Sequence, residues 1–347
     1  MSNTNRKRIL IFLILLSTTL LPIVYSFSFR FQISNLPNIH VLSFNTLMAF
    51  PDKALNPKNK LSAKFDEEKL TPKEFEKILH YLYLKNYCLV NLFDMVNLDD
   101  LSIGFTPSNF PSNKTPLVLT FDNVSYKSNY QNHGEVDKII IDHKGEFATY
   151  TTKKSIQDRI QYDNEFLVIL EDFVDKYPDF SFNGAKGLIC LSGENGILGY
   201  NTNTKSANSK YEIERATEVV TLLKKRGWIF GSNNYKYIID TNKSEIEFKK
   251  ELLLWQNEVA SIVGETSIYS CPKGQLDTNK LDELKVNNYK IILYNDFTNS
   301  PEINNNLLLL PTKKINGNSL RNNADNLDKY FDCKSVYDSE NRTKSYA

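Results

Sequence analysis

Apolar and polar positions follow two rhythms along this chain. Short apolar runs bounded by Gly, Pro, Asn or Asp recur and are typical of buried strands. Between most of them lie segments with apolar residues three and four positions apart, the spacing of a helix with one buried face. The predicted strands are residues 40–44, 88–92, 116–122, 187–191, 228–230, 267–270, 290–294 and 307–310, and the later predicted helices are 164–177, 211–226, 244–263 and 281–287. Alternating strands and helices favour a parallel α/β barrel or open sheet over an all-β domain.

The first predicted helix has a clear N-terminal signal at Thr71. Pro72 suits the first helical turn, and Glu74 follows three residues after Thr71, which is the spacing of a capping box. Two polar segments flank this part of the chain, residues 50–70 and 97–115, and each contains two prolines. We expect both segments to be loops.

One segment departs from the alternation of strands and helices. Residues 136–142 and 146–151 are both strand-like, and His143, Lys144 and Gly145 between them form a hairpin turn signal. The sequence therefore predicts a β-hairpin, residues 136–151, inserted into the α/β pattern.

The N-terminal residues 1–29 differ from the rest of the chain. Arg6, Lys7 and Arg8 precede a run from residue 9 to residue 29 that has no charged side chain. This pattern is typical of a signal peptide or an uncleaved membrane anchor, and its length favours an anchor with the basic end in the cytoplasm. Both interpretations place the remainder outside the cytoplasmic membrane. We expect a linker at residues 30–37, one domain at 38–340 and a tail at 341–347.

Charge and cysteine content exclude two classes of protein. Among 347 residues, 42 are Lys or Arg and 41 are Asp or Glu, and no long basic run lies beyond the N-terminus, so nucleic acid is not an expected partner. The four cysteines form no CxxC pair, and the chain is too long to need disulfides for stability. We expect small buried apolar side chains at these positions, although a disulfide outside the cell stays open.

The most informative stretch is KTPLVLTFDNVS, residues 114–125. A buried strand ends here in Asp122 and Asn123, and carboxylates at the C-terminal end of a barrel strand are where catalytic groups usually lie. The stretch resembles the TFDDG motif of polysaccharide deacetylases, the NodB-homology family. The resemblance implies that Asp122 stands at the position of the general base. It also implies that Asn123 replaces an aspartate that ligates a metal.

A second stretch, GWIFGSNNYKY at residues 227–237, resembles the family's histidine motif. The two histidine positions of that motif correspond to Asn233 and Tyr237, and Asn45 stands where some relatives have a third histidine. Zinc in this family would activate water and polarise the acetamide carbonyl. Asn is a poor zinc ligand, and Tyr needs deprotonation from a pKa near 10. We therefore expect no cofactor, although the family uses a divalent metal.

Three further stretches resemble the same family in the same order. They are AKGLICLSGENGILGY at residues 185–200, YSCPKG at 269–274 with Pro272 and Gly274, and residues 314–321. The resemblance covers about residues 38–340. It implies a distorted (β/α) barrel with the site at the C-terminal ends of the strands.

These substitutions leave the function open between three hypotheses. The leading hypothesis is an extracytoplasmic family member that binds cell-envelope N-acetylated glycan or peptidoglycan, with weak or no deacetylase activity. The second is an active carbohydrate hydrolase, either a deacetylase with unusual ligands or a glycosidase that uses Asp122, Glu194 and Asp296 as paired carboxylates. The third is a non-catalytic structural or protein-interaction module.

Overall fold

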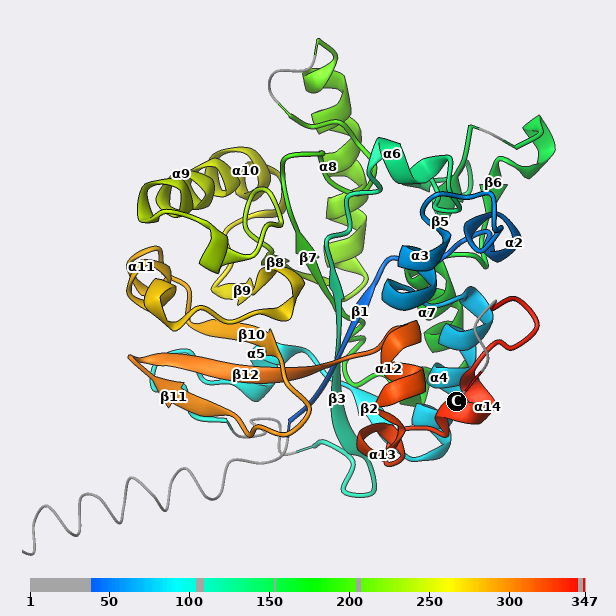
Figure 1. The fold of residues 1–347 in the computed structure, drawn as a ribbon. Coiled ribbons are helices and arrows are strands. Elements are labelled where there is room, and N and C mark those ends of the chain that lie inside the picture. Colours follow the sequence, from blue (N-terminus) through cyan, green and yellow to red (C-terminus); the bar gives the residue numbers. More distant parts are fainter. Residues whose placement is uncertain (1–38, 104–108, 153, 204–206, 343–345, 347) are drawn as a thin grey trace, which may run out of the picture.

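A closed ring of seven parallel strands forms the centre of the protein (Figure 1). The computed structural model describes residues 39–347 apart from 104–108, 153, 204–206, 343–345 and 347. In ring order the strands are β1 (His40–Asn45), β12 (Leu307–Lys314), β10 (Ile291–Asn295), β9 (Ile268–Ser270), β8 (Ile229–Ser232), β7 (Leu188–Leu191) and β3 (Thr115–Asp122). Pairing of β1 with β3 closes the ring. The predicted distorted (β/α) barrel is confirmed.

Two further strands extend the barrel sheet outside the ring. β2 (Tyr87–Leu89) pairs in parallel with β3, and β11 (Glu302–Asn304) pairs antiparallel with β12. The prediction of a strand at 88–92 was too long at its C-terminal end, because Asn91 caps a short helix that begins at Leu92. β11 was not predicted.

Helices surround the ring, and Figure 1 shows α9, α10 and α11 on one side of the barrel and α4, α7, α12 and α14 on the other. Their bounds are α2 Pro51–Ala54, α3 Ser62–Glu68, α4 Pro72–Leu84, α5 Leu92–Met95, α6 Ser128–Gln131, α7 Phe166–Lys176, α8 Ser209–Lys225, α9 Glu245–Trp255, α10 Ser261–Val263, α11 Leu281–Val286, α12 Gly317–Asn322, α13 Ala324–Leu327 and α14 Cys333–Val336. The capping box predicted at Thr71 is present. A π-helical stretch, Gln256–Ala260, joins α9 to α10, so the helix predicted at 244–263 is interrupted.

Residues 50–70 were predicted to be a loop, but they contain α2 and α3. Phe65 of α3 is fully buried and packs with Met48, Ala54 and Leu55 in a small apolar cluster of its own. Burial of this one aromatic ring explains why a polar, proline-containing segment becomes helical, since tertiary contacts override weak local propensity.

The predicted hairpin is confirmed as part of a separate antiparallel sheet. β4 (Lys138–Ile141) pairs with β5 (Phe147–Tyr150), and β5 also pairs with β6 (Ile160–Gln161), which was not predicted. This sheet lies outside the barrel ring, between β3 and α7 in the chain.

Side chains alternate between the inner and outer faces of the ring strands and so form two separate apolar layers. Inside the ring lie Val41, Val118, Leu188, Ile268 and Leu308, which belong to one buried cluster. Side chains of the opposite parity face the surrounding helices, and their contacts include a ring stack between Phe121 and Phe166 of α7. The lower part of the barrel interior is therefore apolar, whereas its upper part, at the C-terminal ends of the strands, is polar.

The predicted anchor at residues 1–29 and the linker at 30–37 lie outside the described residues. Within the described ranges, no helix combines the length and the apolar character needed to cross a membrane. All four cysteines are buried and none is in a disulfide.

The C-terminal segment predicted as a tail at 341–347 includes a residue that belongs to the packed domain. Arg342 is buried, its Nε donates to Glu74 Oε1 at 2.7 Å, and its Nη1 donates to Asp66 Oδ1 at 3.0 Å. The guanidinium also binds the backbone oxygens of Asp66 and Lys69. The tail boundary is corrected accordingly, because Arg342 ties the C-terminal region to α3 and α4.

Candidate functional site

Each of the seven ring strands contributes one polar side chain to the upper end of the barrel, which we call the barrel mouth. Side chains alternate between the two faces of a strand, so these residues face the same inward side as the residues two and four positions earlier. Ser192 and Asn233 directly follow β7 and β8, and the others end their strands. The seven residues are Asn45, Asp122, Ser192, Asn233, Ser270, Asn295 and Lys314.

Asp122 is the centre of this network, with only 5% of its surface exposed. Its Oδ2 accepts hydrogen bonds from Ser43 Oγ at 2.8 Å and from Lys314 Nζ at 2.9 Å. Its Oδ1 accepts from Ser270 Oγ at 2.8 Å and from Asn233 Nδ2 at 3.3 Å. A carboxylate has about four acceptor positions, so Asp122 has none to spare.

The charge of Asp122 is stabilised in spite of its burial. Burial alone would raise the pKa of Asp122, but the Lys314 ammonium and hydrogen bonds from Lys314, Ser43 and Ser270 outweigh burial and lower this pKa. A carboxylate with a lowered pKa and four donors is a weak proton acceptor. To act as a general base, Asp122 would first have to lose one of these partners.

Lys314 supplies the positive charge of the barrel mouth. Besides Asp122, its Nζ contacts Asn45 Oδ1 at 2.8 Å, the Phe44 carbonyl oxygen at 3.2 Å and Ser43 Oγ at 3.3 Å. The side chain is 16% exposed. The ammonium is therefore held in a cage of oxygens and neutralises the one carboxylate within this network. Sequence reasoning noted the stretch that begins with Lys314 but assigned it no role.

The predicted ligand positions Asn123 and Asn233 lie together beside Asp122. Asn233 is fully buried, and its Oδ1 accepts from the Asn123 backbone N–H at 2.7 Å while its Nδ2 donates to Asp122 and to the Ser270 carbonyl oxygen. Asn123 has a φ of +54°, and its Oδ1 accepts from Ser192 Oγ at 2.8 Å. Both side-chain oxygens therefore already accept hydrogen bonds that fix the backbone at the ends of β3 and β8.

Tyr237 also lies near Asp122. Burial raises the pKa of the Tyr237 phenol well above its ordinary value, and the charge of Asp122 adds to this, against a hydrogen bond from the Lys273 backbone. The phenol is therefore a neutral group that does not become a phenolate ligand at physiological pH.

These residues do not fit the metal that the family resemblance implies. Two amide oxygens are engaged in hydrogen bonds, the phenol stays protonated, and the Lys314 ammonium lies at hydrogen-bonding distance from Asp122. Across the described ranges of the chain, no cluster of three or more His, Cys, Asp or Glu side chains has the arrangement to hold a metal ion. We derive no metal-dependent step from this barrel.

The turn after β9, which contains the candidate residues Pro272 and Gly274, lies against the strand-end residue Asn295. The turn spans Pro272–Gly274, and Gly274 has a φ of +73°. A side chain at Gly274 would place its Cβ 2.4 Å from Cβ of Asn295. Glycine is therefore required both by the backbone angle and by the close approach of two strand ends.

The carboxylates Glu194 and Asp296 are not brought together with Asp122 by any hydrogen bond in the described residues. Asp296 instead organises its own turn, where Oδ1 accepts from the backbone N–H groups of Thr298 at 2.7 Å and Asn299 at 2.8 Å. Burial would raise the pKa of Asp296, but these hydrogen bonds lower it. Glu194 is exposed. These contacts do not favour the paired-carboxylate arrangement of a glycosidase.

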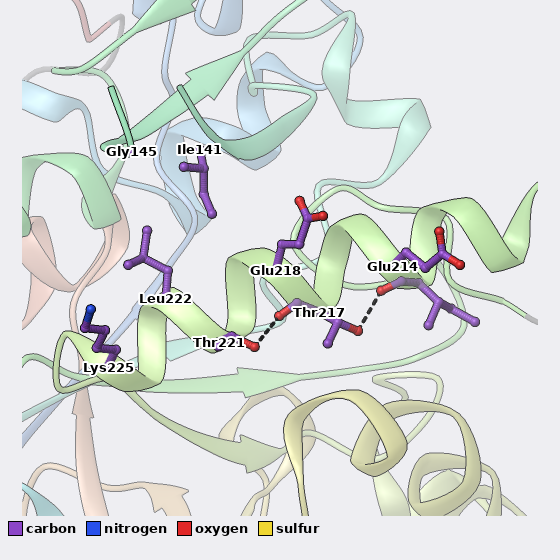
Figure 2. Close-up of a pocket in the computed structure, with 9 residues that line it drawn as sticks. Ile141, Gly145, Glu214, Thr217, Glu218, Thr221, Leu222 and Lys225 are labelled. Carbon is purple, nitrogen blue, oxygen red and sulfur yellow. Dashed lines mark hydrogen bonds between the residues drawn. The ribbon is translucent and has the colours of Figure 1, made fainter. Parts of the chain in front are cut away.

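A separate apolar hollow lies on the flank of the molecule, between the hairpin and α8 (Figure 2). It has a volume of about 700 Å³ and is lined by Ile141 and Gly145 of the hairpin and by residues of α8 from Ile213 to Lys225. The hydroxyl of Thr217 donates to the Ile213 carbonyl and that of Thr221 to the Thr217 carbonyl, so both hydroxyls are satisfied within the helix. None of its lining residues belongs to the barrel mouth.

Comparisons with known proteins gave matches among solved structures only. No protein-family model and no curated protein sequence matches the chain. The deacetylase PplD from Streptococcus pyogenes, solved with acetate, is 14% identical with a TM-score of 0.47 and aligns over 81% of this chain and 93% of its own. A polysaccharide deacetylase from Bacillus cereus is 14% identical with a TM-score of 0.45, over 80% of this chain and only 65% of its own length. IcaB from Ammonifex degensii is 10% identical with a TM-score of 0.43, over 82% and 94%. The first of these structures is described as a deacetylase and the second as a polysaccharide deacetylase.

Proposed function

We propose that this protein is an extracytoplasmic, membrane-tethered relative of the polysaccharide deacetylases that binds N-acetylated glycan of the cell envelope at its barrel mouth and has little or no metal-dependent deacetylase activity. The observation that carries this proposal is the saturated Asp122 carboxylate, bound to Lys314, Ser43, Ser270 and Asn233. A carboxylate fixed in this way serves to order the mouth rather than to move a proton.

The chemistry of the barrel mouth supports a neutral, hydroxyl-rich ligand. The Asp122 and Lys314 charges cancel, and the other five strand-end side chains are amides and hydroxyls. Amides, hydroxyls and a neutral phenol such as Tyr237 pair with sugar hydroxyls and with an acetamido group, since each provides both a donor and an acceptor.

The test measures glycan binding, metal binding and acetate release on the same full-length protein. Calorimetric titration with N-acetylated chitooligosaccharides is expected to show binding, and titration with zinc or cobalt is expected to show none. Tyr237→Phe is expected to weaken glycan binding by roughly tenfold, because one hydrogen bond to the ligand is lost. Tyr162→Phe, a matched change of an exposed tyrosine that directly follows β6, should leave the affinity unchanged.

Two results would contradict the proposal. Zinc-dependent release of acetate from the oligosaccharide that disappears in Asp122→Ala would show an active deacetylase with unusual ligands. An absence of binding to both chitooligosaccharides and purified peptidoglycan would instead favour a structural or protein-interaction module.

A further inference from the structure

A second buried polar cluster lies beside the barrel mouth and is not part of its network. Lys69 Nζ lies 2.5 Å from Glu135 Oε1 and donates to the Thr46 carbonyl oxygen at 3.0 Å. The Thr46 hydroxyl donates to the same Glu135 oxygen at 2.9 Å. Each of these three residues is at most 5% exposed. Glu135 is therefore a charged partner of Lys69, in direct contact and away from water.

Glu165 joins this cluster from the N-terminus of α7 and is completely buried. Its Oε1 accepts from the backbone N–H of Leu47 at 3.0 Å and from that of Phe166 at 2.9 Å. The first bond reaches the segment that follows β1, and the second caps the helix. One carboxyl group therefore holds the chain after β1 against α7.

The cluster has two acidic groups, and within the described residues Lys69 is the one lysine that forms an ion pair with either of them, although the charge of Lys127 also acts on Glu135. Lys69 forms its ion pair with Glu135, so Glu165 has no counter-ion in contact with it in the described structure. The remaining neighbour is Tyr126, which is 3% exposed and whose hydroxyl has no hydrogen-bond partner within the described residues. The phenol brings no compensating charge, and both burial and the two glutamates raise its pKa.

We propose that Glu135 takes up the charge of Lys69 and leaves Glu165 protonated, and that neutral Glu165 is a pH-sensitive latch whose oxygens hold the segment after β1 against the N-terminus of α7. The proton resides on Glu165, because Glu135 has the direct contact with Lys69. Burial raises the pKa of Glu165 to about 8, and Glu135 adds to this, while the Leu47 and Phe166 amides and Lys69 oppose it.

The latch is coupled to the barrel mouth through the chain itself. Leu47 lies two residues after Asn45, whose Oδ1 accepts from the Lys314 ammonium. Ionisation of Glu165 places an uncompensated charge in a buried site, and the segment after β1 is released to let water reach it. Asn45 then loses its fixed position. The latch does not depend on the proposal that the protein binds glycan. An effect of the latch on glycan affinity, through Asn45 and Lys314, would rest on that proposal.

The direction of the pH effect on stability follows from the proton balance. Between about pH 4.5 and pH 8 the folded state binds more protons at Glu165 than the unfolded state, so the free energy of unfolding falls as pH rises. His40 acts in the opposite direction, because burial, Lys329 and Lys313 lower its pKa from 6.5 to about 4. Above about pH 6.5 the His40 contribution is constant and no longer opposes the Glu165 effect.

Hydrogen exchange of the Leu47 and Phe166 amides on the full-length protein tests the latch. Rates are measured from about pH 6.5 to about pH 9 and divided by the intrinsic rates of the unfolded chain. In the wild type, protection of both amides is expected to fall by tenfold or more across about pH 8. In Glu165→Gln, which keeps an acceptor oxygen and cannot ionise, protection is expected to stay constant. Equal pH profiles in the two proteins would overturn the proposal.

A second variant predicts the direction in which the pH of half-loss should move, and it does not depend on whether Glu165→Gln folds. Glu135→Gln removes the repulsive charge and frees Lys69 to neutralise Glu165, so the pH of half-loss is expected to move lower. Glu218→Gln, on the exposed face of α8, should leave that pH unchanged. An unshifted midpoint in Glu135→Gln would overturn the proposal that Glu135 keeps Lys69 from neutralising Glu165. Because no readout contains glycan, failure here is distinguishable from failure of the proposed function.

Discussion

Replacing Lys314 with methionine is expected to lower the free energy of unfolding by about 3–5 kcal/mol, because it leaves the buried Asp122 carboxylate without a counter-ion. Methionine keeps most of the length of the side chain, so the loss reports the ammonium rather than packing. Without Lys314, burial is no longer outweighed, and the pKa of Asp122 is expected to rise above its ordinary value. Urea denaturation at neutral pH measures the stability loss.

The neighbouring lysine provides the matched control. Lys313 precedes Lys314 on the same strand, and burial and the nearby Lys329 lower its pKa, so Lys313→Met should cost little or nothing. The double variant Asp122→Asn/Lys314→Met is expected to recover much of the loss, because neither charge remains. Equal stability of Lys313→Met and Lys314→Met would refute the assignment of Lys314 as the essential counter-ion.

The strands of the barrel were predicted well because the patterns that indicate each strand lie within a short segment of the sequence. Seven apolar runs became the ring strands, and the capping box at Thr71 began a helix as expected. The short helices in residues 50–70 were missed because their formation depends on burial of Phe65, which pattern alone does not reveal. The π-helical stretch within 244–263 was missed because the sequence there is continuously helix-forming.

The barrel mouth was predicted in part. Asn45, Asp122 and Asn233, which the sequence analysis singled out, lie together because the carboxyl ends of parallel strands meet at one end of a barrel. Lys314 was not identified, because its role depends on the register that places it beside Ser43. A rule that each ring strand contributes one polar end residue would have found it. The Glu135–Glu165 cluster joins segments far apart in the sequence, and no local pattern signals it.

A substitution at Arg342, near the C-terminal end of the domain, should destabilise the protein as much as the substitution of Lys314 at the barrel mouth. Arg342→Met is expected to lower the free energy of unfolding by about 3–5 kcal/mol, because Asp66 and Glu74 then lose a buried guanidinium that binds both carboxylates. The Arg342 side chain has no exposed surface, so water cannot replace it without opening the contact between α3, α4 and the chain end. Thermal or urea unfolding of the full-length protein measures the effect.

Arg215→Met is the control, since it breaks an ion pair of an arginine with a glutamate on the surface of α8. Exposed pairs contribute at most about 1 kcal/mol, so Arg215→Met should unfold almost as the wild type does. A chain that ends at residue 341 should be at least as destabilised as Arg342→Met, since both lack the guanidinium that binds Asp66 and Glu74 and the shorter chain also lacks Tyr346, which packs on Tyr337. If both arginine variants are equally stable, Asp66 and Glu74 must be neutralised by other means, and residues beyond 340 would then behave as the tail that the sequence predicted.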